Sequence, residues 1–294
     1  MRDSAHLALM EKSWIDYDMA ENIYRAIKAC SASTAKALIS DGGAEKFAWK
    51  LNHPTPQSDV FNFGSAAHQA VLGGGEPLVE IPADCLSKTG TATTNAAKDF
   101  KAKAKNEGKR AMTPTEMSKL NDMAEVVHER FGWLLKDFRP EVSFGYLHPD
   151  CNVEVKGRID ALTPHGIVDY KTVASADLDA FRRNVTKYGY HIQAAHYFDS
   201  ARALGLGVEF FYFLLQEKEA PFQTRLVELD ERFVKLGRAD FARGMKVWKR
   251  CIETDTWPGL SNQVTRIEPF AWQLPYDLPN KKTPAVKRFE GEEF

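Results

Sequence analysis

The sequence predicts one integrated mixed α/β domain with a helical N-terminal subdomain, and three observations carry this prediction. The chain has 294 residues, of which 44% are hydrophobic and 11% aromatic, so it can bury a large core. Apolar residues recur with a helical period in the first half and with an alternating, strand-like period in the middle. No composition shift marks a linker, and no repeat is present. We expect a helical region over residues 1–140, a core over residues 141–260 and a C-terminal tail over residues 261–294.

Four helices are expected in the N-terminal region, each with a recognisable boundary. They cover residues 31–39, 63–72, 96–106 and 113–136. Ser31 or Ser33 can cap the first helix, and three consecutive glycines end the second. The fourth begins with a proline in its first turn, a position that tolerates the missing N–H group.

Strands are expected once the hydrophobic period changes to two. Three of them, at residues 141–148, 153–162 and 166–173, are separated by short turns and predict an antiparallel meander. The pattern then predicts helices at residues 176–186 and 192–204, strands at residues 208–215 and 223–229, and a helix at residues 231–252. The expected core is therefore a mixed sheet flanked by helices.

Charge and hydropathy exclude several classes of protein. The longest apolar run, Phe210 to Leu215, is far shorter than the roughly 18 residues of a membrane span, and Met1 to Trp14 lacks the apolar block of a secretory signal. The four cysteines are scattered, which is typical of reduced thiols, and we expect a cytoplasmic protein without a membrane partner.

A net charge of −1 gives no overall attraction to a polyanion, so nucleic-acid contacts must be local. Six basic residues against two acidic ones lie between Lys98 and Arg110. This segment can follow a phosphate backbone, or it can be an ordinary solvated helix face.

The sequence Lys156-Gly157-Arg158-Ile159-Asp160, followed eight residues later by Asp169-Tyr170-Lys171, carries the strongest chemical signal. On a strand, Asp169 and Lys171 point to one face and Tyr170 to the other. A hairpin partner brings Asp160 alongside, and two carboxylates with a lysine can hold Mg²⁺ next to a phosphate. The Tyr170 carbonyl oxygen is a possible further ligand. The same spacing is also common on solvated strands.

Two helical segments add candidates. Gln193 and Tyr197 are four residues apart and share a helix face, although an ordinary amphipathic helix gives the same pattern. His68 follows the small residues of Gly64-Ser65-Ala66-Ala67 and offers one imidazole, a good metal donor when neutral. A single such histidine is often only structural. His191 and His196 flank the Gln-Tyr face and are expected near the substrate.

Nucleases of the PD-(D/E)XK class with a RecB-type site resemble this chain in an ordered set of six residues: His68, Asp160, Asp169, Lys171, Gln193 and Tyr197. Within that class the sequence is most similar to the exodeoxyribonuclease VIII (RecE) family of phages and prophages. The resemblance extends from about Ser31 to Trp257 and implies a restriction-endonuclease-like core. The second carboxylate of the motif is Asp169 where the family usually has Glu.

The resemblance also implies roles. His68, Asp160 and Asp169 would bind Mg²⁺, with Mn²⁺ as a substitute, and Lys171 would be the catalytic lysine. Gln193 and Tyr197 would form the helix motif beside the site. Glu141 is a possible accessory acid. Some relatives carry an iron–sulfur cluster held by three clustered downstream cysteines; only Cys251 follows Tyr197 here, so no cluster is expected.

The implied activity is digestion of linear double-stranded DNA from the 5′ end, which leaves 3′ single strands for an annealing recombinase of the RecT type. A homo-oligomeric ring around DNA, such as a tetramer, is implied as well, with the segment from Lys98 to Arg110 and the residues Arg182, Arg183 and Lys187 as channel candidates. A structure-specific endonuclease and a non-catalytic DNA-binding protein of the same fold are the alternatives.

Overall fold

The computed structural model describes residues 13–53 and 59–269, apart from the side chains of residues 59–62. Most of the predicted tail therefore lies outside the described residues. Met1–Gly259 forms one compact unit and Leu260–Phe294 a second. The described part of the second unit, residues 260–269, has neither helix nor strand.

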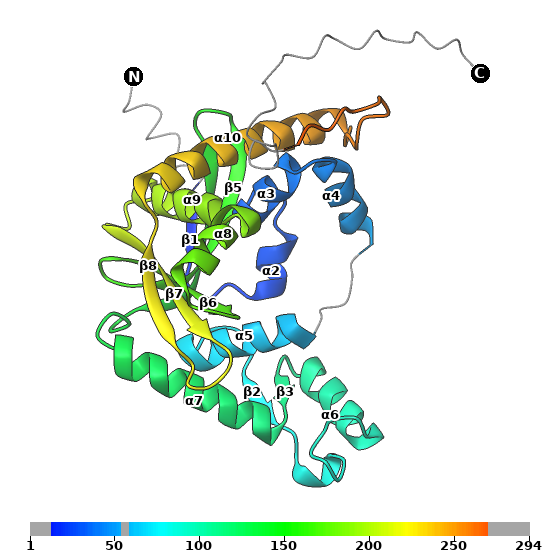
Figure 1. The fold of residues 1–294 in the computed structure, drawn as a ribbon, viewed down its shortest axis with the longest axis vertical. Helices are drawn as coiled ribbons and strands as arrows, with labels where there is room; N and C mark the ends of the chain where they lie inside the picture. The colour runs from blue at the N-terminus through cyan, green and yellow to red at the C-terminus, as the bar shows by residue number, and fades with distance from the viewer. Residues whose placement is uncertain (1–12, 54–58, 270–294) are drawn as a thin grey trace, which may run out of the picture. The chain divides into compact units, whose positions relative to one another are not determined.

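A six-stranded mixed sheet forms the centre of the first unit (Figure 1). Its strands lie in the order β1 (Trp14–Asp16), β4 (Arg139–His148), β5 (Val153–Leu162), β6 (Gly166–Val173), β7 (Phe210–Glu217) and β8 (Thr224–Glu228). All neighbours are antiparallel except β6 and β7, which run parallel. The predicted meander is confirmed, and β5 and β6 have the predicted boundaries. Because β6 and β7 are parallel, the chain crosses over between them through two helices.

A second, two-stranded parallel sheet is formed by β2 (Leu78–Glu80) and β3 (Arg110–Met112). The helices are α2 (Glu21–Ala26), α3 (Ala32–Ile39), α4 (Gly43–Asn52), α5 (Asp59–Leu72), η1 (Ala83–Cys85), α6 (Asn95–Asn106), α7 (Pro114–Phe131), α8 (Leu178–Tyr188), α9 (Tyr190–Ala203) and α10 (Glu231–Thr254). Among the described residues, none of these helices is long and apolar enough to cross a bilayer.

Side-chain caps fix several helix starts where the sequence predicts them. The Ser31 hydroxyl accepts a hydrogen bond from the Thr34 N–H group at 3.2 Å, and Thr113 with Glu116 forms a capping box at the start of α7. Helix α7 ends at Phe131, before the predicted residue 136. Helix α4, which is not among the four predicted helices, begins after Gly42, whose backbone is left-handed with φ of 61°.

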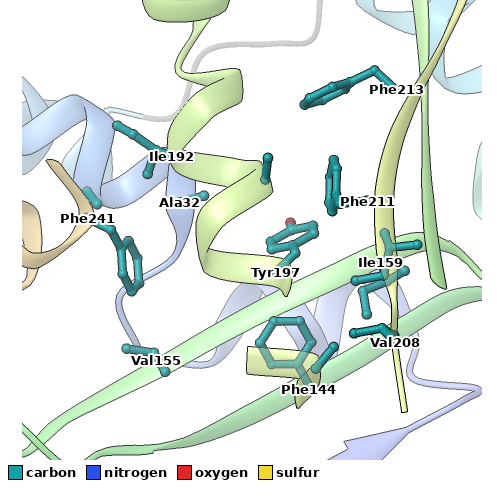
Figure 2. Close-up of a cluster of buried hydrophobic side chains, with 14 of the residues drawn as sticks. Ala32, Phe144, Val155, Ile159, Ile192, Tyr197, Val208, Phe211, Phe213 and Phe241 are labelled. Atoms are coloured by element: carbon teal, nitrogen blue, oxygen red, sulfur yellow. The ribbon is translucent and has the colours of Figure 1, made fainter. Parts of the chain in front are cut away.

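Two hydrophobic cores cover the two faces of the sheet. On one face α3, α8 and α9 pack on β4, β5 and β7, with α10 packed on α3 and α9; on the other face α5 and α7 pack on β6. Figure 2 shows the first core, in which Phe144, Ile159 and Phe211 surround Tyr197 of α9. Gly157 permits this packing, because a Cβ atom there would lie 2.3 Å from the Phe144 ring.

Strands β5 and β6 form a fork. They pair only at Ala161 with Val168 and at Leu162 with Ile167. Beyond that point the edge of β5 pairs with the chain before α3, through a bridge between Val155 and Cys30. The first residues past the last paired rung, one on each strand, are therefore not paired with each other.

Candidate functional site

Asp160 and Asp169 are the residues at which the fork opens, one on each strand. The register places them opposite each other, one rung beyond the pair formed by Ala161 and Val168. Tyr170, whose N–H group is released from the ladder, donates to Asp160 Oδ2 at 3.1 Å. Like charges on opposite strand positions repel, so these two carboxylates require a compensating cation or proton.

Lys171 supplies one positive charge. Its Nζ atom lies 2.5 Å from Asp169 Oδ2. The side chains of Asp169 and Lys171 are two residues apart on β6 and share a face, as the strand period predicts. Tyr170 points to the other face, into the core formed with α5 and α7.

Gln193 holds the remaining oxygen of Asp169. Its Nε2 atom donates to Asp169 Oδ1 at 2.6 Å, and Asp169 itself is completely buried. An ordinary amphipathic helix would leave this glutamine in solvent. The structure therefore joins Gln193 of α9 to the carboxylates of the sheet and confirms their predicted proximity.

His68 approaches the fork from α5. Its Nδ1 atom lies 3.5 Å from Asp160 Oδ2, and its ring contacts the Tyr170 ring edge-on with centroids 5.0 Å apart. The structure thus brings His68, Asp160, Asp169 and Lys171 into one cluster, with the Tyr170 backbone between them.

Burial dominates the protonation of this cluster. It raises the pKa of Asp160 to about 6 and that of Asp169 to about 7, although the nearby Lys171 ammonium opposes both shifts. Burial, assisted by Lys171, lowers the pKa of His68 to about 4, so its imidazole is neutral at pH 7. For Lys171, burial lowers the pKa, but the carboxylates of Asp169 and Asp160 outweigh it and the pKa is raised.

The donors present fit a divalent cation by their chemistry. Asp169 Oδ2 is buried and accepts no well-oriented hydrogen bond, despite its ion pair with Lys171. Two carboxylates and a neutral imidazole are ligands that Mg²⁺ or Mn²⁺ accepts. Within residues 13–53 and 59–269, however, no three His, Cys, Asp or Glu side chains are gathered tightly enough to hold an ion as they stand. The ligand set of His68, Asp160 and Asp169 therefore stays a prediction.

Tyr197 lies one turn beyond Gln193 and belongs to the core. Figure 2 shows its ring among Phe211, Ile159 and Phe144, and only its hydroxyl reaches a polar group, the Arg158 N–H at 3.4 Å. Its predicted role in the helix motif beside the site stays a prediction.

Arg158 is a residue that the sequence did not single out as functional. Its guanidinium donates to Glu141 Oε2 at 3.0 Å, to Ser143 Oγ at 2.9 Å and to the Met19 carbonyl at 2.8 Å. Glu141, predicted as an accessory acid, has φ of 55° and lies opposite Asp160, where the pairing of β4 with β5 skips one rung. The sequence did carry a signal for Arg158: Lys156, Arg158 and Asp160 are two residues apart along one strand, so their side chains share a face.

His191 and His196 were expected to contact substrate, and this expectation is wrong for the described conformation. Both are buried. His191 Nε2 lies 3.0 Å from Asp240 Oδ2 of α10, and His196 Nε2 lies 3.0 Å from the Lys156 carbonyl oxygen. These two contacts join α9 to α10 and to β5, and buried polar side chains are usually hydrogen-bonded in this way.

Comparison with known proteins supports this description of the fold. Residues 24–268 match the model of a family described as "PDDEXK-like domain of unknown function (DUF3799)". A crystal structure of a protein named "Putative exonuclease" from Eubacterium rectale is similar, with a TM-score of 0.58 and 15% sequence identity over 89% of this chain and 99% of that chain. No curated protein matches the sequence. Since the family match spans most of the sequence, the chain belongs to the PDDEXK-like DUF3799 family and has the PD-(D/E)XK nuclease fold.

Proposed function

We propose that the protein is a divalent-metal-dependent deoxyribonuclease. The observation that carries this proposal is the fork of β5 and β6, where Asp160 and Asp169 oppose each other and Lys171 lies 2.5 Å from Asp169. Membership of a PDDEXK-like family supports it. His68, Asp160 and Asp169 would hold the metal ion, with the Tyr170 carbonyl as a further oxygen donor.

The protein's own residues supply positioning and charge. A bound divalent ion would lower the pKa of a water molecule and offset charge on the scissile phosphate. The Lys171 ammonium, kept charged by its carboxylate neighbours, stabilises negative charge that develops on the phosphate. Gln193 fixes the orientation of the Asp169 carboxylate, and the neutral imidazole of His68 keeps a lone pair available.

The finer proposal is an exonuclease of the RecE type that degrades linear duplex DNA from 5′ to 3′ and leaves 3′ single strands. It rests on the sequence resemblance described above. The similar protein from Eubacterium rectale is itself named "Putative exonuclease", which supports the proposal. An annealing recombinase of the RecT type would then use the single strands in recombination. The same proposal includes that a phage or prophage encodes the protein and that it acts in the cytoplasm of the bacterial host.

Two alternatives share the fold. A structure-specific endonuclease would cut at flaps or branches, and a non-catalytic binder would use the same surface without hydrolysis. The second is disfavoured because the charged cluster is complete: a protein that only binds DNA has no need of the fully buried Asp169, the partly buried Asp160 and their lysine partner, whose burial costs stability.

Linear and circular DNA separate these possibilities. Duplexes labelled at the 5′ or the 3′ end, and a covalently closed circle of the same sequence, are incubated with and without Mg²⁺. A 5′-to-3′ exonuclease releases the 5′ label first, with Mg²⁺, and leaves the circle intact. Nicking of the circle would show that the protein is an endonuclease and not an exonuclease. Binding of both substrates without any cleavage, with Mg²⁺ or Mn²⁺, would refute the proposed activity.

A further inference from the structure

A pocket of about 560 Å³ opens beside the candidate site, between α3, α4 and the junction of α8 with α9. Three lysines line it, namely Lys36, Lys46 and Lys50, together with three serines, and its lining contains no Asp or Glu. Its surroundings therefore favour an anion, although the whole chain is close to neutral.

Two contacts connect this pocket to the fork. Gln193 is part of the pocket wall, and its amide donates to Asp169 at 2.6 Å. The Tyr188 ring lies 5.7 Å from the Tyr190 ring, which in turn lies 5.6 Å from Lys171 Nζ. A ligand in the pocket would thus lie next to a phosphate placed at the candidate site.

Tyr188 gives the pocket an aromatic surface. It is 48% exposed and lines the pocket, so its ring is accessible to a ligand there. The next residue, Gly189, turns the chain sharply with φ of 76° between α8 and α9. Lys36 and Lys187 place their Nζ atoms 5.9 and 5.3 Å from the Tyr188 ring centroid.

An exposed aromatic ring among ammonium groups is the combination that proteins use to bind single-stranded nucleic acid. Bases stack on the ring, and lysines follow the phosphates without reading sequence. The pocket volume lies in the range of pockets that enclose small-molecule ligands, so it suits one or two nucleotides.

We propose that this pocket is a subsite for unpaired nucleotides of the DNA strand whose end is cut, with one base on Tyr188 and the phosphates on Lys36, Lys46 and Lys50. This inference rests on the proposed nuclease function. It predicts that the DNA end must be frayed before the strand reaches Asp160 and Asp169, and that short single strands bind without any metal.

Binding and cleavage are measured separately in the test. A fluorescently labelled octamer of thymidine is titrated with the full chain in EDTA, and its polarisation gives the affinity. Tyr188→Leu should weaken binding about tenfold, the loss expected for one stacked base. Tyr17→Leu, which removes an aromatic ring of similar exposure away from the pocket, should stay within about twofold of the wild type.

The lysines are tested by the salt dependence. A variant in which Lys36, Lys46 and Lys50 are all changed to Gln should reduce the slope of log affinity against log salt by about 2, since each phosphate contact on a single strand contributes about 0.7. The matched control changes three exposed lysines outside the pocket, namely Lys136, Lys235 and Lys246, to Gln. It should leave the octamer slope unchanged.

Wild-type affinity and slope in both pocket variants would overturn the inference, and so would equal losses in the controls. Circular dichroism of each variant establishes that it is folded. Because the titration contains no metal, its outcome is independent of cleavage: normal metal-dependent cleavage with unaltered octamer binding removes the subsite alone, whereas pocket-dependent binding without cleavage removes the nuclease proposal alone.

Discussion

Asp169, which is fully buried, and Asp160, which is partly buried, lie opposite each other where two strands separate, and their protonation sets how a cation can bind. A proton and a metal ion compete for the same oxygen atoms. With pKa values of about 6 and about 7, both side chains bind protons in the range in which most carboxylates are ionised. His68 is already neutral above about pH 4, so it adds little to the pH dependence at pH 6 and above.

Metal affinity is therefore expected to rise with pH. Between pH 5.5 and 7.5 the two carboxylates lose their protons, and each proton released strengthens binding by up to about tenfold per pH unit. Calorimetric titration of Mn²⁺ at pH 5.5, 6.5 and 7.5 measures this. Asp169→Asn should bind weakly at every pH, and a wild-type affinity that does not change with pH would contradict the assignment.

Gln193 acts on the same carboxylate from α9. Gln193→Leu removes the amide group that donates to Asp169 Oδ1, and loss of such an orienting contact typically costs 10- to 100-fold in metal affinity. The exposed Gln223→Leu is the matched control and should bind Mn²⁺ like the wild type. If both variants bind equally well, Gln193 does not position Asp169.

The fork is the element that turns a sequence motif into a site. Strands β5 and β6 were predictable to the residue, because turn residues bound each alternating segment. Their separation was not predictable, since it requires the edge of β5 to pair with Cys30 more than 100 positions earlier in the chain. Local pattern fixes which side chains share a face, whereas distant pairing decides where the ladder opens.

The elements that escaped prediction are short and depend on contacts across the chain. Helix α2 has six residues, none of them buried. The Lys156 ammonium holds it by donating to the Tyr24 carbonyl at 2.7 Å and to the Ile27 carbonyl at 2.8 Å, and Arg158 donates to Met19 just before it. A six-residue helix has little stability of its own, so its sequence carries a weak signal.

Packing of α9 on the sheet depends on Gly157. Gly157→Ala would place a methyl group 2.3 Å from the Phe144 ring, and overpacking of this kind costs about 1–3 kcal/mol. Gly64→Ala, on helix α5, meets no atom closer than 3.6 Å and should instead stabilise the protein by about 0.5–1 kcal/mol. Urea unfolding of the two variants measures both free energies, and equal changes would refute the close approach at Gly157.

The whole molecule is close to neutral, so sustained attachment to DNA requires local basic surfaces or assembly around the duplex. Four lysines of α6 are exposed, at positions 98, 101, 103 and 105, and Arg183 and Lys187 of α8 are exposed as well. They are the channel candidates of the ring that the sequence resemblance implies. Light scattering at micromolar concentration should give a mass several times 33.1 kDa. A strict monomer would contradict the ring.

Metal-dependent cleavage with and without the Lys171 ammonium tests the central claim most directly, which is that the fork of β5 and β6 is a hydrolytic site. Release of label from linear duplex is followed for the wild type, for Lys171→Ala and for Lys235→Ala, which removes an exposed lysine paired with Glu231 on α10. We expect cleavage only with Mg²⁺ or Mn²⁺, a loss of at least about 100-fold in Lys171→Ala with DNA binding retained, and no loss in Lys235→Ala. Full activity of Lys171→Ala, or equal cleavage in EDTA, would contradict the account.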